Sequence, residues 1–141
     1  MKIYLDNCCF NRPFDDQSQV KIHIEAQAKL DIQKNIKQGN YDLVWSYILE
    51  YENEMNPFEE RKESIIKWKN IAKEKIVANS DIISLAESIC NQGIKPKDAL
   101  HISCAIYAKC KYFITTDRLL LNKNVNGIKI INPTQFILEE A

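Results

Sequence analysis

Three aspartates occupy places in the chain from which their carboxylates could meet. Asp6 and Asp117 each end a short apolar run that has the length of a β-strand, and Asp98 falls in the first turn of a later helix. If the two strands are parallel, their carboxyl ends lie at one edge of the sheet, which is where open α/β proteins bind ligands. We therefore expect the three side chains to converge on one cleft.

A fourth acidic group can come from the helix that follows the second predicted strand. Glu50 and Glu52 both lie in the first two turns of that helix, where either could face the same cleft. Their residue types and positions leave both open as candidates.

A group of converging carboxylates favours a divalent cation. Like charges that come close repel, raise one another's pKa values and destabilise the fold. Mg²⁺ or Mn²⁺ relieves the repulsion and prefers hard oxygen ligands over histidine or thiolate. Such an ion activates water and neutralises charge on a phosphodiester, which favours metal-assisted hydrolysis of a nucleic-acid backbone. The structural alternative is that these aspartates form turns after strands or offset a helix dipole.

Composition excludes several other chemistries. The 141 residues include three glycines and two histidines, so neither a glycine-rich phosphate loop nor a multi-histidine metal cage is encoded. Lys and Arg number 19 and Asp and Glu number 19, which gives a formal net charge of zero. A nucleic acid would therefore be held locally and not by a general positive field. The basic residues expected nearest the cleft, as phosphate contacts, are Arg12, Lys95, Lys97 and Arg118.

Five cysteines without a CxxC pair indicate small buried thiols in a reducing compartment. A sharper alternative is a Cys/His nucleophile, because Cys104 lies three residues after His101. Nothing near His101 in the sequence would orient its imidazole for that role. Its position one helical turn after Asp98 also allows a ligand or a base, but we favour a core histidine because its helix is apolar nearly all round. No apolar run approaches the roughly 18 residues of a membrane span, and the amino end lacks a signal-peptide core. We expect a soluble, cytoplasmic protein with no membrane partner.

The order of the predicted elements defines the fold class. Strands separated by helices predict one α/β domain over residues 1–141, with a parallel sheet between helical layers. The helix over 15–38 has an apolar residue at every fourth position, at Val20, Ile24, Ala28 and Ile32. Ser46 is placed to cap the helix after the second strand. The predicted strands span 2–5, 41–45, 112–115 and 127–131, and the predicted helices span 15–38, 47–56, 57–77, 81–90, 97–109 and a segment after Pro133.

Three stretches together resemble the acidic motifs of PIN-domain ribonucleases. In the order and spacing of that family, these stretches are Ile3–Asn7, Pro96–Ile102 and Tyr112–Arg118. The resemblance spans nearly the whole chain and implies a three-layer α/β/α sandwich with a small parallel sheet. It implies a Mg²⁺- or Mn²⁺-dependent endoribonuclease, as in the VapC-type toxins of bacterial toxin-antitoxin pairs. Asp6, Asp98 and Asp117 correspond to the metal-binding acids of the family.

The family's remaining acid is a glutamate on the helix after the second strand. Counted from Ser46, the family spacing falls on Glu52 better than on Glu50. Glu52 also lies three residues after Leu49, on the side of the helix expected to face the core, whereas Glu50 is turned about 100° from Leu49. The expected catalytic residues are therefore Asp6, Glu52, Asp98 and Asp117.

The resemblance also implies partners. An RNA is the expected substrate, a cognate antitoxin is a possible protein partner, and the chain is a possible homodimer. The alternative is a PIN-like module that has lost catalysis and binds only RNA or a protein. A receiver-like phosphoacceptor domain is set aside because the second strand ends in Ser46 where an aspartate would be needed. Asn7, Thr115 and Thr116 flank the proposed ligands and could support a carboxylate or simply cap turns.

Overall fold

A five-stranded, all-parallel sheet forms the centre of the molecule in the computed structural model, which describes residues 1–140. The strand order is β3-β2-β1-β4-β5, so β1 is the central strand. Leu5 of β1 pairs with Ile114 of β4, and Asp6 and Thr115 therefore leave the sheet side by side. The strands are β1 (Lys2–Leu5), β2 (Asp42–Ser46), β3 (Glu74–Ile76), β4 (Tyr112–Ile114) and β5 (Lys129–Ile131).

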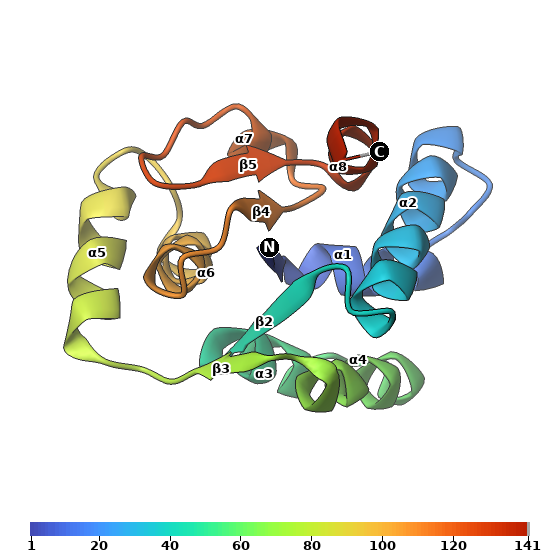
Figure 1. The fold of residues 1–141 in the computed structure, drawn as a ribbon, viewed down its shortest axis with the longest axis horizontal. Coiled ribbons are helices and arrows are strands. Elements are labelled where there is room, and N and C mark those ends of the chain that lie inside the picture. The colour runs from blue at the N-terminus through green and yellow to red at the C-terminus, as the bar shows by residue number, and fades with distance from the viewer. Residues whose placement is uncertain (141) are drawn as a thin grey trace.

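Helices cover both faces of this sheet. Figure 1 shows α5 and α6 on one side and α1, α2 and α8 on the other, with α3 and α4 beyond the β3 edge. This arrangement confirms the predicted α/β sandwich with a small parallel sheet. The helices are α1 (Asn7–Asn11), the 3-10 turn η1 (Arg12–Phe14), α2 (Val20–Lys37), α3 (Tyr47–Glu54), α4 (Glu59–Ile71), α5 (Ser80–Cys90), α6 (Pro96–Tyr107), α7 (Arg118–Leu121) and α8 (Pro133–Glu140).

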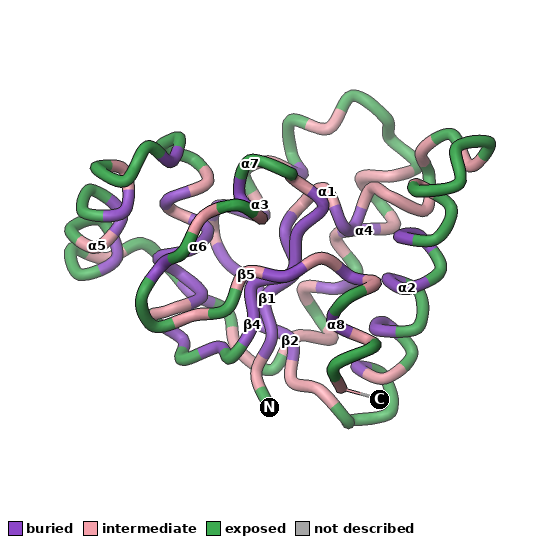
Figure 2. The backbone as a smooth tube through the Cα atoms, turned by 90° about the horizontal axis from the view of Figure 1, so that it is seen from above, coloured by how far each residue is buried: buried purple, intermediate pink, exposed green. Residues whose placement is uncertain are grey.

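The hydrophobic core lies on both sides of β1. Ile3, Tyr4 and Leu5 are completely buried, as the strand of a sheet covered on both faces should be. Figure 2 shows the same burial along β1, β2 and β4. The Tyr4 ring stacks on Phe113 with 5.4 Å between ring centroids, which joins β1 to β4 through side chains as well as backbone.

Capping residues determine where the helices near the sheet edge begin. The predicted cap at Ser46 is confirmed, because its Oγ accepts the Leu49 N–H at 3.2 Å and starts α3. Pro96 occupies the first turn of α6, where a missing N–H costs nothing. Gly93, in the turn that follows α5, has a φ of +84°. Glycine adopts this left-handed conformation without strain.

The predicted helix over 57–77 is wrong in its last six residues, 72–77. Helix α4 ends at Ile71, and Glu74–Ile76 forms the edge strand β3, paired with β2. In the sequence, the charged residues Glu74 and Lys75 are typical of an exposed helix face. In the structure they belong to an edge strand, whose charged side chains lie at the edge of the sheet. Tertiary pairing with β2 overrides the local preference.

The apolar stripe predicted for the helix over 15–38 is also partly wrong. The helix begins at Val20, which is 73% exposed, and Ile24 is 47% exposed. The buried face instead includes Glu25 and Lys29, at 2% and 3% exposure. Charged residues reach the interior here because Arg12 pairs with the Glu25 carboxylate at 3.0 Å and aromatic rings surround the Lys29 ammonium.

Candidate active site

Asp6 is fixed at the carboxyl end of β1 by hydrogen bonds to both of its oxygens. Oδ1 accepts the Asn7 N–H at 2.8 Å, which makes Asp6 the cap of α1, and Oδ2 accepts the Thr115 hydroxyl at 2.8 Å. The residue is 6% exposed. The donors are the first residue of α1 and a residue just after β4, so the start of α1 and the pairing of β1 with β4 together determine where this carboxylate lies.

Asp117 caps the short helix α7 and shares a partner with Asp6. Its Oδ1 accepts the Leu119 N–H at 2.8 Å, which is the turn-forming role considered for it from sequence. Its own N–H donates to Thr115 Oγ1 at 3.1 Å. Thr115 therefore joins the two segments, since its hydroxyl accepts from one and donates to the carboxylate of the other.

Asp98 lies in the first turn of α6, and the charges of both other aspartates affect its pKa. Burial raises the pKa of its carboxyl above the usual value, and the negative charges of Asp6 and Asp117 raise it further. Asp98 and Asp117 also line one small pocket of about 60 Å³. The charges of Asp6 and Asp117 therefore reach Asp98 at this edge of the sheet.

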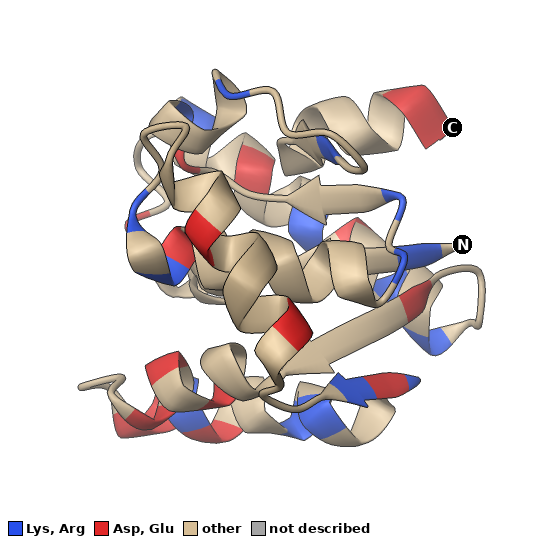
Figure 3. Cartoon of the chain, turned by 90° about the vertical axis from the view of Figure 1, so that its left-hand side faces the viewer, with Lys and Arg blue, Asp and Glu red and all other residues tan. Residues whose placement is uncertain are grey.

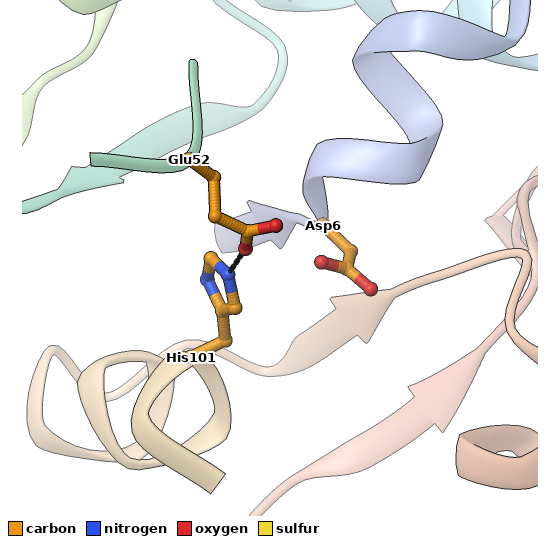
Figure 4. A group of neighbouring side chains, drawn as sticks. All are labelled: Asp6, Glu52 and His101. Atoms are coloured by element: carbon orange, nitrogen blue, oxygen red, sulfur yellow. Dashed lines mark hydrogen bonds and ion pairs between the residues drawn. The ribbon is translucent and has the colours of Figure 1, made fainter. Parts of the chain in front are cut away.

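Glu52 reaches the same edge from α3. The structure brings one ligand atom each of Asp6, Glu52 and His101 within 4.8 Å of one another, and Figure 4 shows the Glu52 carboxylate beside that of Asp6. Among residues 1–140, Asp98 and Asp117 are not part of this tight group. Glu50, the other candidate, forms an ion pair with Lys69 on α4 instead.

His101 holds the Glu52 carboxylate. Its Nε2 bonds to Glu52 Oε1, and Lys97 Nζ lies 3.8 Å from Glu52 Oε2. Burial alone would raise the pKa of Glu52, but the hydrogen bond from His101, together with Lys97 and Asn7, lowers it below the usual value. Glu52 is therefore ionised at neutral pH.

A buried chain of hydrogen bonds orients the imidazole. Tyr4 Oη lies 2.6 Å from His101 Nδ1 and 2.5 Å from Ser46 Oγ, which accepts the Leu49 N–H. Burial is the main reason that the pKa of Tyr4 is raised well above its usual value, so its phenol remains a donor. One set of donors satisfies every group: Ser46 donates to Tyr4, Tyr4 to His101 Nδ1, and His101 Nε2 to Glu52.

The contact between His101 and Glu52 was not predicted from the sequence. His101 is completely buried with both ring nitrogens bonded, as expected for a core histidine, yet one of its partners is a site acid. The available signal was its position one helical turn after Asp98, which places both side chains on one face of α6. The Cys/His nucleophile is excluded, because Cys104 is buried and burial raises the pKa of its thiol to about 12.

The basic residues near the site differ in their availability. Arg12, predicted as a phosphate contact, instead forms ion pairs with Asp15 at 3.1 Å and with the buried Glu25. Lys97 is 55% exposed and lies beside Glu52, while Lys95 lines the small pocket of Asp98. Along α3 and α4, at the bottom of Figure 3, acidic and basic residues are interspersed, and Lys69 of α4 is paired with Glu50 of α3.

The donors at this edge fit a hard divalent cation. Asp6, Glu52, Asp98 and Asp117 offer carboxylate oxygens, which are the ligands that Mg²⁺ and Mn²⁺ prefer. Burial and the nearby charges of Asp6 and Asp117 both raise the pKa of Asp98, and a bound cation would oppose both effects. His101 Nε2 is occupied by Glu52, so the imidazole supports an acid ligand from behind.

The fold has a counterpart among solved structures. No protein-family model and no curated protein sequence matches the chain. A chain in the crystal structure of VapBC2 from Rickettsia felis bound to a DNA fragment from their promoter has the same fold, with a TM-score of 0.58. The match covers 94% of this chain and 98% of that chain at 16% identity. At that identity the likeness defines the fold class, PIN-like, and leaves function to be argued from the site. None of the helices within residues 1–140 has the length and hydropathy needed to cross a membrane.

Proposed function

We propose that this chain is a Mg²⁺- or Mn²⁺-dependent endoribonuclease that hydrolyses RNA phosphodiester bonds, and that it acts as the toxin of a toxin-antitoxin pair. The observation that carries the proposal is the placement of the acids at the carboxyl end of the sheet. Asp6 lies beside Glu52, Thr115 bonds to both Asp6 and Asp117, and Asp117 lines one small pocket with Asp98. The PIN-like fold, shared with a chain of the VapBC2 structure, supports it.

Each acidic side chain has a distinct part in this proposal. Asp6, Asp98 and Asp117 hold the ion, which when bound activates water and neutralises charge on the phosphodiester. Glu52 Oε1 is held by His101, which leaves Oε2 to orient the attacking water and accept its proton. Lys97, beside Oε2 and half exposed, is placed to contact a substrate phosphate.

Cleavage of a labelled single-stranded RNA in Mn²⁺, with an EDTA control, tests the proposal. Asp98→Asn keeps the shape of the side chain and removes its charge, so we expect cleavage to fall at least about a hundredfold. The matched control is Glu50→Gln on α3, which removes a carboxylate that pairs with Lys69 away from the acid group. Undiminished cleavage by Asp98→Asn contradicts the assignment. A folded wild-type chain that neither binds Mn²⁺ nor cuts RNA would instead be a binding module.

The partner in this proposal is a cognate antitoxin protein encoded beside the chain. Expression of the chain alone should arrest growth, and co-expression of a small neighbouring reading frame should restore it. Growth that is unaffected by the wild-type chain would argue against a toxin. The proposed homodimer is tested separately by the solution mass from light scattering.

A further inference from the structure

A second recess adjoins the acid site and shares two of its residues. This pocket of about 430 Å³ lies between α1, α3 and the beginning of α4, and Glu52 and Lys97 form part of its wall. Its size is within the range of pockets that hold small organic ligands. A molecule bound here would contact the carboxylate that we place next to the reacting phosphate.

Two aromatic rings line the pocket without being part of the core. Tyr51 on α3 is 54% exposed and Phe58, just before α4, is 55% exposed. The Arg61 guanidinium lies 4.4 Å from the centre of the Phe58 ring. Arg61 is itself fixed, because it donates to Asp15 Oδ1 at 3.2 Å and to the Phe14 carbonyl at 2.8 Å. Phe58 is thus held on one side by Arg61, and the exposed rings of Phe58 and Tyr51 offer stacking surfaces for nucleobases.

Three asparagines supply hydrogen-bonding groups in the same wall. Asn56 Nδ2 donates to Asn11 Oδ1 at 3.2 Å, and Asn11 Nδ2 donates to the Asn7 carbonyl at 3.1 Å. Asn56 Oδ1 also accepts the Phe58 N–H at 3.1 Å, so the amide and the ring are positioned together. Each amide nitrogen carries two protons, and an asparagine amide can pair with the edge of an unstacked base.

The charges of the pocket favour a polyanion whose bases are unpaired. Lys97 and Arg61 are cationic, and Glu52 is the acid of the wall, at the junction with the metal-binding edge. Flat aromatic surfaces combined with amides suit nucleobases better than the aliphatic side chains of a peptide helix, which need a continuous apolar groove.

We infer that this pocket is a nucleotide-binding subsite for single-stranded RNA, in which Tyr51 and Phe58 stack on a base next to the scissile phosphate and Asn56 bonds to its edge. The inference rests on the proposed nuclease function for the position of that phosphate. The binding itself does not depend on catalysis.

Binding and cleavage by the full chain are measured separately. Fluorescence anisotropy of a labelled single-stranded RNA in EDTA reports binding without the ion. We expect Tyr51→Ala and Phe58→Ala each to weaken binding about tenfold, and Tyr51→Phe to retain it. Tyr107→Ala is the matched control, because Tyr107 is 48% exposed on α6 and is not among the residues that line the pocket. Circular dichroism and melting temperature establish that each variant is folded.

The results separate the subsite from the nuclease. Pocket-dependent RNA binding by a chain that cuts nothing supports the subsite and rejects the nuclease. Cleavage and binding that are unchanged in both alanine variants reject the subsite and leave the nuclease standing. Absence of RNA binding by the wild-type chain rejects the subsite. If both alanine variants lose antitoxin binding but bind RNA as the wild type does, the subsite is also rejected, and the pocket is assigned to a protein partner.

Discussion

Lys29 provides a prediction whose size follows from its surroundings. The residue is 3% exposed on α2, and its Nζ lies 5.3 Å from the centre of the Phe10 ring and 5.9 Å from that of Trp68. Burial lowers the pKa of Lys29 from 10.5 to about 7, with Cys9 opposing and Lys37 reinforcing the shift. Replacing this ammonium by an apolar side chain of similar length should therefore stabilise the fold.

The magnitude comes from proton linkage. A fall in pKa from 10.5 to about 7 corresponds to about 5 kcal/mol of unfavourable free energy in acid, where the lysine is charged in both states. The folded state binds fewer protons than the unfolded state between these values, so stability rises with pH. Between about pH 7 and pH 9, Lys29 should add roughly 2 kcal/mol to the free energy of unfolding.

Urea unfolding of the wild-type chain and Lys29→Met at both pH values measures this effect. Near pH 7 the free energy of unfolding of the variant should exceed that of the wild type by several kcal/mol. Near pH 9 this difference should be about 2 kcal/mol smaller. Lys34→Met is the control, because Lys34 is an exposed lysine on the same helix. If Lys29→Met is no more stable than the wild type near pH 7, or if its advantage does not shrink with rising pH, the reasoning is refuted.

Two further predictions concern the site. Tyr4→Phe removes the hydroxyl that bonds to Ser46 Oγ and to His101 Nδ1, so the Ser46 hydroxyl proton and His101 Nδ1 lose their buried partner. We therefore expect a loss of about 1–3 kcal/mol in urea unfolding. A loss below about 0.5 kcal/mol would show that the chain of hydrogen bonds does not stabilise the fold. Asp98→Asn should raise the melting temperature of the metal-free chain near neutral pH, because a raised carboxyl pKa means that ionised Asp98 opposes folding. The gain should disappear in acid, where Asp98 is protonated. Equal melting temperatures at neutral pH would show that burial and the neighbouring charges do not disfavour ionised Asp98.

Much of the fold could be predicted from local patterns. The apolar runs at Lys2–Leu5 and Tyr112–Ile114 are confirmed as strands, because a strand buried on both faces reads as a continuous apolar stretch. The edge strand Glu74–Ile76 could not be found this way, since its pairing with β2 depends on tertiary contact. The helices α1 and α7 are too short to show a period, although each begins directly after a capping aspartate.

Local patterns likewise predict some features of the candidate site, while others depend on tertiary contacts. The placement of Asp6 and Asp117 follows from strand ends in a parallel sheet, which sequence patterns can reveal. The bond between His101 and Glu52 joins residues on α6 and α3, and no local pattern specifies it. The pairing of Arg12 with Glu25 was missed for a related reason, since a buried ion pair looks in sequence like two surface charges.

Few residue types could replace Thr115, because its hydroxyl forms hydrogen bonds both to the Asp6 carboxylate and to the Asp117 N–H. Its single hydroxyl must accept an amide proton from the chain that leads into α7 and at the same time donate to the carboxylate that leads into α1. Valine has the same outline but can do neither, and alanine would also leave a gap in a completely buried place. An uncharged side chain thereby sets the spacing of two acids, and serine is the one other residue that could take over both duties.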